Sequence, residues 1–240
     1  MMSSRISKAT TTVTKMIKNN NGFFFVSVLI FFFATSNIPA QSIDTLTAIH
    51  CPAEWHQIIA KNTFDETLLV ESLTFCTNRI RASRKLPLLQ SSAPLQISSK
   101  KHSCEMARLS HLSHQSPTLS SRTLNQRIAN EGIVLENTAI AENIAVDFVL
   151  AISDLPYHIR KNSKGSQYID AKTGKPIKAQ SYFDFAQRLV HLWMASPGHR
   201  DNIINPVFTN VGFGVCYGNY KGLEAVYVTQ NFLGNFEQNL

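Results

Sequence analysis

The fold is decided by Trp193–Gly214, WMASPGHRDNIINPVFTNVGFG, which joins a helix end, a histidine and the start of a strand. Before it, apolar residues recur every three or four positions from Tyr182 to Ala195, a spacing that predicts a helix. Ser196-Pro197-Gly198 ends that helix, because the residue before a proline is pushed out of the α region. We therefore expect His199 on a tight turn at the helix end, where functional sites are often built.

The end of this stretch alternates bulky and small residues, which predicts a strand. The bulky residues are Val211, Phe213 and Val215, and the small ones are Gly212, Gly214 and Cys216. The bare face of such a strand allows another element to approach closely. Residues 223–233 alternate in a similar way after the loop 218–222, so the two segments are expected to form a hairpin.

Residues 1–40 have the composition of a secretory signal peptide. Four basic residues and no acidic ones precede an apolar run of roughly a dozen residues, GFFFVSVLIFFFA, whereas a membrane span needs about 20. We expect removal between Ala34 and Ala40, export to the periplasm or the medium, and no membrane span in the mature chain. An uncleaved signal anchor is the alternative, because Ile38 stands where a cleavage site usually has a small residue.

The mature chain is long enough for one domain with its own core. Its formal charge is +3, since four of the basic residues behind the whole-chain value of +7 lie in the leader. That charge is too small to indicate a nucleic-acid partner. We predict an N-terminal arm over residues 41–64, a domain over 65–234 with a basic surface insertion at 153–180, and a tail at 235–240.

Four cysteines, an even number in an exported chain, favour disulfides. They are Cys51, Cys76, Cys104 and Cys216. Cys76 and Cys104 fall on consecutive predicted helices, so their pairing is favoured, which leaves Cys51 with Cys216. Four buried thiols are the alternative. Metal binding by cysteine is disfavoured because no two are spaced as C-x-x-C.

Helical periodicity also predicts helices over residues 65–82, 93–109 and 124–132, the last closed by Gly132. The apolar run 138–148 is expected to be a strand, and Glu142 within it must have a partner or face a cavity. Residues 167–178 are expected to form a small hairpin around Gly174. Helices on both sides of a strand, followed by a terminal hairpin, indicate an α+β domain with an antiparallel sheet covered by helices.

Four motifs carry a family resemblance: KKHSCEMARLSHLSH, AENIAV, LVHLWMASPGHRDNIINPVFTNVGFGV and YVTQNF. In this order they resemble the CAP superfamily, which includes cysteine-rich secretory proteins, insect venom antigen 5 and plant pathogenesis-related proteins. The similarity is greatest to the bacterial branch and covers roughly residues 65–234. It implies a three-layer α-β-α sandwich with a central antiparallel sheet.

The resemblance also implies a cavity lined by two histidines and two glutamates. His114 and His199 resemble the two histidines, and Glu142 resembles the first glutamate. Ser196 stands where the second glutamate is expected, a departure that removes one acid from any metal chemistry. Two imidazoles and one carboxylate match the three protein ligands of a catalytic zinc, so Zn²⁺ or another divalent cation is a candidate cofactor. The same groups would serve as an acid–base cluster.

Simpler interpretations apply to each of these residues. His114 could be an ordinary surface histidine, His199 could bond a nearby main-chain carbonyl, and Glu142 could orient a histidine rather than act on a substrate. The other polar candidates have expected structural roles. His111 is expected at the rim, His102 packed in the interior, and Asn143 and Asn202 as hydrogen-bonding residues.

Three functional classes follow. The first is a secreted module that binds a small ligand, a lipid, a peptide or an envelope component. The second is a metal-dependent or His/Glu hydrolase of peptides or envelope polymers, although the chain lacks H-E-x-x-H and G-x-S-x-G and shows no evident nucleophile. The third is a structural protein whose basic insertion contacts an acidic surface. The sequence favours the binding module.

Overall fold

The computed structural model describes residues 13–19, 22–28, 51–152, 156–162 and 165–235. The chain forms two compact units, Met1–Gln41 and Ser42–Leu240. In the first, strand β1 (Val13–Asn19) pairs with strand β2 (Gly22–Val28) in an antiparallel hairpin. The expected leader includes this hairpin, and its role in export stays a prediction. No helix among the described residues is both long and apolar enough to cross a membrane.

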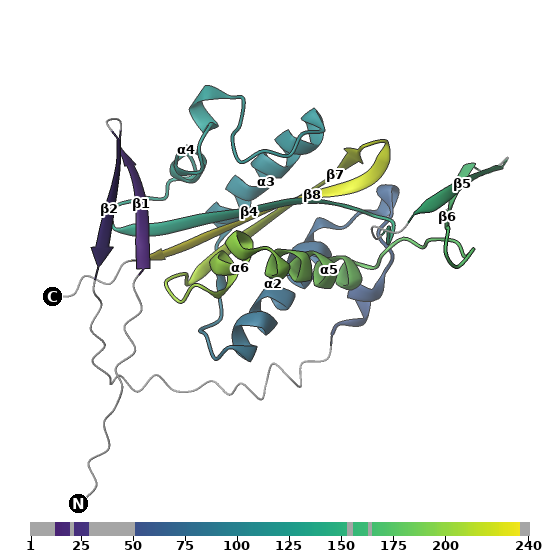
Figure 1. Cartoon of the computed structure of the whole chain (residues 1–240), viewed down its shortest axis with the longest axis horizontal. Coiled ribbons are helices and arrows are strands. Elements are labelled where there is room, and N and C mark those ends of the chain that lie inside the picture. The colour runs from purple at the N-terminus through teal and green to yellow at the C-terminus, as the bar shows by residue number, and fades with distance from the viewer. Residues whose placement is uncertain (1–12, 20–21, 29–50, 153–155, 163–164, 236–240) are drawn as a thin grey trace, which may run out of the picture. The chain divides into compact units, whose positions relative to one another are not determined.

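The second unit is a three-layer sandwich around a four-stranded sheet (Figure 1). The strand order is β3 (Gln90–Ser91), β7 (Asn210–Tyr220), β8 (Leu223–Asn235) and β4 (Thr138–Phe148). The helices α3 (Ala93–Leu109) and α4 (Leu124–Ala129) cover one face, and α2 (Glu66–Ser83), α5 (Tyr182–Ala195) and α6 (Pro197–Ile204) cover the other. This confirms the predicted α+β sandwich. The short β3 runs parallel to β7, so the sheet is mixed at this one edge.

The helix and strand boundaries follow from local signals in the sequence. α3, α5 and β4 have the predicted limits. α2 begins one residue later than predicted because Asp65 is its N-cap and accepts hydrogen bonds from the main-chain N–H groups of Thr67 and Leu68. α4 begins at a reciprocal capping box between Thr123 and Gln126. Before α2, the arm forms the short 3-10 turns η1 (Ala53–His56) and η2 (Lys61–Thr63).

The predicted tight turn at His199 is wrong, because the helix α6 begins two residues earlier and includes His199. Pro197 is its first residue, and a proline suits this position because its φ is already helical and the first N–H groups of a helix have no partner to lose. Ser196 therefore ends α5 and precedes α6. His199 lies in the first turn of α6.

The small-residue face of β7 is in backbone contact with α3, as its sequence predicted. A Cβ atom at Gly212 would collide with the main chain of Leu95, and one at Gly214 with that of Ser99 and Lys100. At this short separation the hydroxyl of Ser99 donates to the Gly212 carbonyl at 2.8 Å. Ser103 does the same to Gly214 at 2.8 Å.

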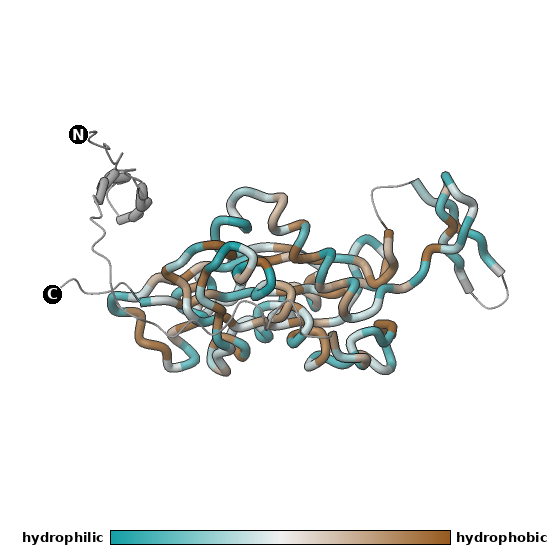
Figure 2. The backbone as a smooth tube through the Cα atoms, turned by 90° about the horizontal axis from the view of Figure 1, so that it is seen from below, coloured by the Kyte–Doolittle hydropathy of each residue, from teal (hydrophilic) through white to brown (hydrophobic). Residues whose placement is uncertain are grey.

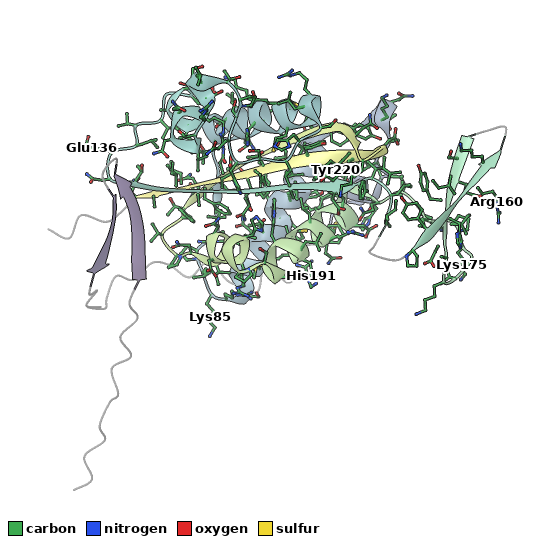
Figure 3. All side chains as sticks on the ribbon, turned by 45° about the horizontal axis from the view of Figure 1, so that its top comes forward. Lys85, Glu136, Arg160, Lys175, His191 and Tyr220 are labelled. Carbon is green, nitrogen blue, oxygen red and sulfur yellow. A yellow bond between two sulfur atoms is a disulfide. The ribbon has the colours of Figure 1, made fainter. Side chains whose placement is uncertain are left out.

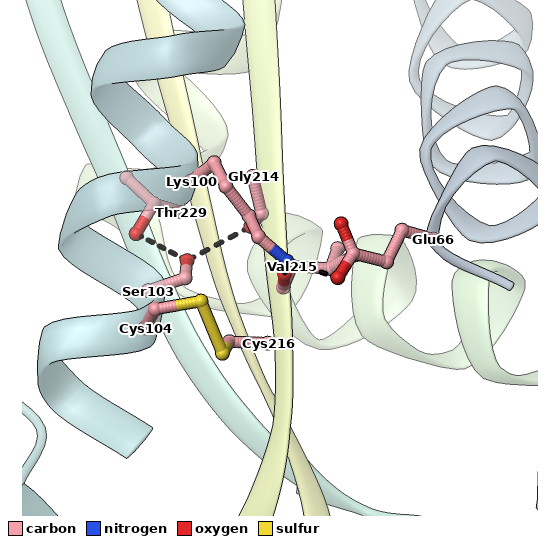
Figure 4. The surroundings of a disulfide bond; sticks show 8 residues. All are labelled: Glu66, Lys100, Ser103, Cys104, Gly214, Val215, Cys216 and Thr229. Atoms are coloured by element: carbon pink, nitrogen blue, oxygen red, sulfur yellow. Dashed lines mark hydrogen bonds and ion pairs between the residues drawn. A yellow bond between two sulfur atoms is a disulfide. The ribbon is translucent and has the colours of Figure 1, made fainter. Parts of the chain in front are cut away.

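The disulfide joins Cys104 on α3 to Cys216 on β7, with a Cα–Cα distance of 5.0 Å (Figure 4). The predicted pairs Cys76–Cys104 and Cys51–Cys216 are therefore wrong. Cys76 lies on α2, and the sheet separates α2 from α3, although the two helices are consecutive in the chain. Cys51 and Cys76 are free thiols in the described structure. Burial raises the pKa of the Cys76 thiol to about 12, so this thiol is protonated at neutral pH.

One buried cation ties the helical layer to the start of β7. Arg81 of α2 is fully buried and donates hydrogen bonds to the main-chain carbonyls of Pro87, Ile203, Asn205 and Phe208 at 2.8–2.9 Å. Burial lowers the pKa of this guanidinium to about 10, which leaves it charged at neutral pH. Four carbonyl dipoles thus replace its hydration and fix the loop that leads into β7.

The basic insertion folds as a hairpin that stands apart from the layers (Figures 1 and 2). Strand β5 (Tyr157–Asn162) pairs with β6 (Gly165–Asp170), a pairing that the sequence did not predict. The predicted hairpin around Gly174 is confirmed in a short form, because Ile169 forms an antiparallel bridge with Pro176. Gly174 has a φ of +68° in its turn, where the Asp170 carboxylate accepts main-chain N–H bonds from Lys172 and Thr173. Arg160 and Lys175 project from this hairpin region (Figure 3).

A methyl group at Gly214 should separate α3 from the sheet. We expect Gly214→Ala to lower the free energy of unfolding by about 3 kcal/mol or more, because the new Cβ meets rigid backbone. Gly218→Ala on the same strand is the control, since its nearest neighbour is the Ala107 side chain at 3.2 Å, and it should cost less than about 1 kcal/mol. Urea denaturation measures both, and equal effects would contradict the backbone contact.

Candidate functional site

Three of the four candidate residues, from three regions of the chain, lie at or near β4, the edge strand of the sheet. Glu142 lies in the middle of β4. His114 lies in the loop after α3, and His199 lies in the first turn of α6. Ser196 lies between α5 and α6, and within the described structure no hydrogen bond joins its side chain to the other three.

The Glu142 carboxylate has a partner for each oxygen. Its Oε1 atom accepts a hydrogen bond from His114 Nδ1 at 2.9 Å, and its Oε2 atom accepts one from Arg127 Nη2 at 2.6 Å. The Glu142 and Arg127 side chains are each only 4% exposed, whereas the His114 side chain is 57% exposed. The buried carboxylate is therefore neutralised by a buried guanidinium, and it holds an imidazole that faces solvent.

Arg127 also fixes the main chain around the exposed histidine. Its Nη1 atom donates to the carbonyl of His114 at 3.2 Å and to that of Arg122 at 3.2 Å. It projects from α4, the short helix with the capping box. The sequence analysis missed Arg127. The only signal was its place beside Ile128 in a short apolar-faced helix, and that pattern does not reveal a partner 15 residues further along the chain.

His102 is packed behind this pair, as predicted. It is 2% exposed, its Nε2 atom is 2.9 Å from the Ser113 carbonyl, and the same atom is 4.0 Å from Glu142 Oε2. Burial is the main cause that lowers the pKa of His102, and it outweighs the opposing effect of the Glu142 charge. His102 is therefore a neutral interior residue that supports the loop carrying His114.

His199 is held at the other side of the cluster by its main chain. Its carbonyl accepts a hydrogen bond from Asn143 Nδ2 at 3.2 Å, and its ring lies 6.4 Å from that of Trp193. Asn202 of α6 donates to the Asn143 side chain at 2.8 Å, which ties α6 to β4. Asn143 and Asn202 thus have the hydrogen-bonding role that the sequence predicted.

The two imidazoles influence each other electrostatically. The pKa of His199 is lowered first by burial and second by the charge of His114. The structure brings His114 and Glu142 into direct contact, and it ties the His199 main chain to Asn143, the next residue of β4. Exposed His111 remains outside this set. Convergence of His114, Glu142 and His199 on one bound atom stays a prediction.

In their present arrangement, the side chains of His114, His199 and Glu142 do not fit a three-ligand zinc site. Both Glu142 oxygens are already occupied, and the Arg127 guanidinium beside them would repel a cation. Among the described residues, no group of three or more histidine, cysteine, aspartate or glutamate side chains is placed to hold a metal ion. We therefore route no chemistry through a metal, and zinc binding stays a prediction.

The arrangement can present a fixed imidazole to a ligand. Because a carboxylate only accepts hydrogen bonds, the proton of the His114–Glu142 bond belongs to Nδ1, and in the neutral imidazole this leaves Nε2 as an acceptor. A carboxylate that orients an imidazole in this way sets its tautomer. The pair is thus a preorganised hydrogen-bonding group, and its geometry would also suit a general base.

The fold and this cluster define a class of protein: an α-β-α sandwich with a histidine–glutamate pair at one edge of the sheet. The chain belongs to the cysteine-rich secretory protein (CAP) family, whose model matches residues 75–232. No curated protein matches the chain.

The solved structures that resemble this one include three bacterial proteins. An extracellular protein with an SCP domain from Bacillus anthracis is 25% identical, with a TM-score of 0.45, over 71% of this chain and 41% of that chain. An outer surface protein from Borrelia burgdorferi is 16% identical, with a TM-score of 0.46, over 72% and 97%. A cysteine-rich secretory protein from Staphylococcus aureus is 16% identical, with a TM-score of 0.42, over 72% and 40%. This chain thus spans less than half of the first and third of these proteins.

Removal of the buried guanidinium should destabilise the protein strongly. We expect Arg127→Met to lower the free energy of unfolding by about 3–5 kcal/mol, because it leaves the Glu142 carboxylate buried without a counter-charge. Arg122→Met, at an exposed arginine of the same loop, should cost less than about 1 kcal/mol. Chemical denaturation compares them. A loss below about 1 kcal/mol for Arg127→Met would show that the ion pair is not needed.

Stability should fall in mild acid because His102 is buried in its neutral form. Its pKa in the unfolded chain is about 6.5, and its folded pKa is lower. Below about pH 6.5 the unfolded state therefore binds more protons, and the stability is lost as the pH falls from the unfolded value toward the folded one. Between about pH 7.5 and 5.5, His102→Gln should lose less stability than the wild type. Exposed His111→Gln is the control and should retain the full loss.

Proposed function

We propose that this protein is an exported binding module that uses His114 and His199 to hold a polar group of an envelope component. The observation that supports it best is the double occupancy of Glu142, whose oxygens bond His114 and Arg127. This carboxylate is committed to orienting an imidazole that is more than half exposed. A ligand can reach the imidazole without entering the core.

Export is part of the proposal. The leader-like residues 1–40 and the Cys104–Cys216 disulfide support it, because disulfides persist in oxidising compartments. The related protein from Bacillus anthracis is described as extracellular. We propose that the mature domain acts outside the cytoplasmic membrane, in the periplasm or in the medium.

A hydrolase is the second candidate, and the His114–Glu142 hydrogen bond of 2.9 Å favours it. An imidazole oriented by a carboxylate could take a proton from water as water attacks a peptide or a glycan. A side-chain nucleophile is not evident beside this pair, because Ser196 makes no hydrogen bond to the cluster in the described structure. The binding module is therefore our first choice.

Binding can be tested by sedimentation with insoluble peptidoglycan as the probe. We expect the mature protein to sediment with the polymer, and His114→Ala and His199→Ala each to weaken binding by about tenfold, because each removes a hydrogen bond at the site. The matched control is His191→Ala, at an exposed histidine on α5 (Figure 3). Equal binding by all four proteins would exclude the histidine site as the binding surface.

Turnover of the same polymer separates the two candidates. If the protein only binds, no soluble fragments appear during prolonged incubation. If it hydrolyses the polymer, fragments appear, and Glu142→Gln should abolish them because the amide cannot support an imidazole that gains a proton. Thermal denaturation of Glu142→Gln is measured in parallel, since loss of the ion pair with Arg127 also lowers stability.

A further inference from the structure

A groove of about 890 Å³ runs along the outer edge of β7, between α2 and α3. It is far larger than the cavity of about 160 Å³ next to His102 and Arg127, and it falls within the size range of ligand pockets. Its walls are the apolar and polar side chains of two helices, and its floor is the strand. The main lining residues are Val70, Thr74, Phe75, Ile97, Phe213 and Val215.

The groove exists because the edge strand β3 is only two residues long. β3 pairs with β7 at Asn210 and Val211, and the chain then turns into α3. The next strand residues, from Gly212 to Val215, have α3 above and α2 below, but the described structure places no strand at their side. The groove therefore occupies the position of a further strand of the sheet.

The backbone of β7 directs hydrogen-bonding groups into this groove that no strand pairs with in the described structure. The Val211 carbonyl accepts a bond from the Ser92 N–H at 2.9 Å, so Val211 faces the outer edge. Alternate residues of a strand face the same side, which places the N–H and C=O groups of Phe213 and Val215 at this edge too. The other side of β7 is paired with β8 along the whole strand.

One side chain covers part of this edge. Lys100 of α3 donates to the Val215 carbonyl at 2.8 Å and forms an ion pair with Glu66 of α2 across the groove (Figure 4). Both partners of the ion pair are partly exposed, with side chains 35% and 49% accessible. Such a pair is weak and easily displaced.

We propose that the outer edge of β7 binds an extended peptide of a partner protein as an additional strand. The site continues the pairing that β3 already makes, and strand addition is satisfied by main-chain hydrogen bonds. A lipid chain could fill the apolar walls but would leave the N–H groups of Phe213 and Val215 without partners. The exposed backbone therefore favours a peptide over a lipid.

The walls of the groove determine the length and the polarity of the peptide. The lining residues of α2 run from Glu66 to Phe75, which is roughly 14 Å along a helix and matches about four residues of a strand. Alternate side chains of an added strand would face α2 and α3, at Val70 and Phe75 on one side and Ile97 on the other. The occupant is thus a segment of about four residues with apolar side chains on both faces.

This site is independent of the proposed histidine site. β7 lies next to β3 at one edge of the sheet, whereas Glu142 lies on β4 at the opposite edge. Loss of peptide binding through changes in the groove therefore says nothing against the histidine site, and the reverse also holds.

The test uses the mature protein and a fluorescent hexapeptide with four central valines between terminal threonines, which presents apolar side chains to both helices. Fluorescence anisotropy should show saturable binding that is lost when alternate peptide nitrogens are methylated. Ile97→Lys should weaken binding by about tenfold or more, because it places a charge against the apolar wall. Leu192→Lys on α5 is the matched control, since Ile97 is 48% exposed and Leu192 is 47% exposed.

Changes at Lys100 separate a peptide from a fatty acid. Lys100→Met frees the Val215 carbonyl, so it should strengthen peptide binding roughly two- to fivefold, whereas a fatty acid held by the ammonium group would bind more weakly. Hydrogen exchange at the Phe213 and Val215 amides should slow when the peptide binds. The proposal is overturned if the methylated peptide binds equally well, if oleate alone fills the groove, or if Ile97→Lys instead abolishes a dimer seen by sedimentation.

Discussion

The backbone contact between α3 and β7 is the constraint on which the rest of this structure depends. Gly212 and Gly214 have no side chain to hold the helix away, so the main chain of α3 lies against the strand. At this separation the Ser99 and Ser103 hydroxyls reach strand carbonyls, and Cys104 comes close enough to bond Cys216. Hydrogen bonds and a disulfide therefore hold α3 against β7 at this contact. Such bonds tolerate little change in the position of the helix.

The same helix determines both surface features of the domain. The start of α3 ends β3 after two residues, and this leaves the β7 edge uncovered between α2 and α3. The end of α3 leads into the loop that places His114 over Glu142 on β4. Because β8 separates β7 from β4, the same helix contributes to two proposed sites at opposite edges of the sheet.

The sequence predicted the features that depend on neighbouring residues. It did not predict on which face of the sheet each helix packs. Apolar periodicity gave the limits of α3 and α5, and the glycines of β7 predicted a close neighbour. The disulfide was predicted wrongly because consecutive helices were assumed to lie on one face of the sheet. Ser196-Pro197-Gly198 predicts a turn, but a proline that ends one helix also suits the first position of the next helix. The sequence pattern alone does not distinguish these two cases. Zinc binding and the export role of the leader stay predictions.

Arg127 shows why the site could be only half predicted. The sequence required a partner for Glu142, since a carboxylate in an apolar strand cannot stay buried alone, and it suggested the two histidines. The actual counter-charge comes from α4 and is buried with the carboxylate. Because Arg127 balances the negative charge of Glu142, the carboxylate can accept the His114 hydrogen bond without a second counter-charge. The histidine is then a hydrogen-bonding group with a fixed direction, and the proposed binding role depends on this feature.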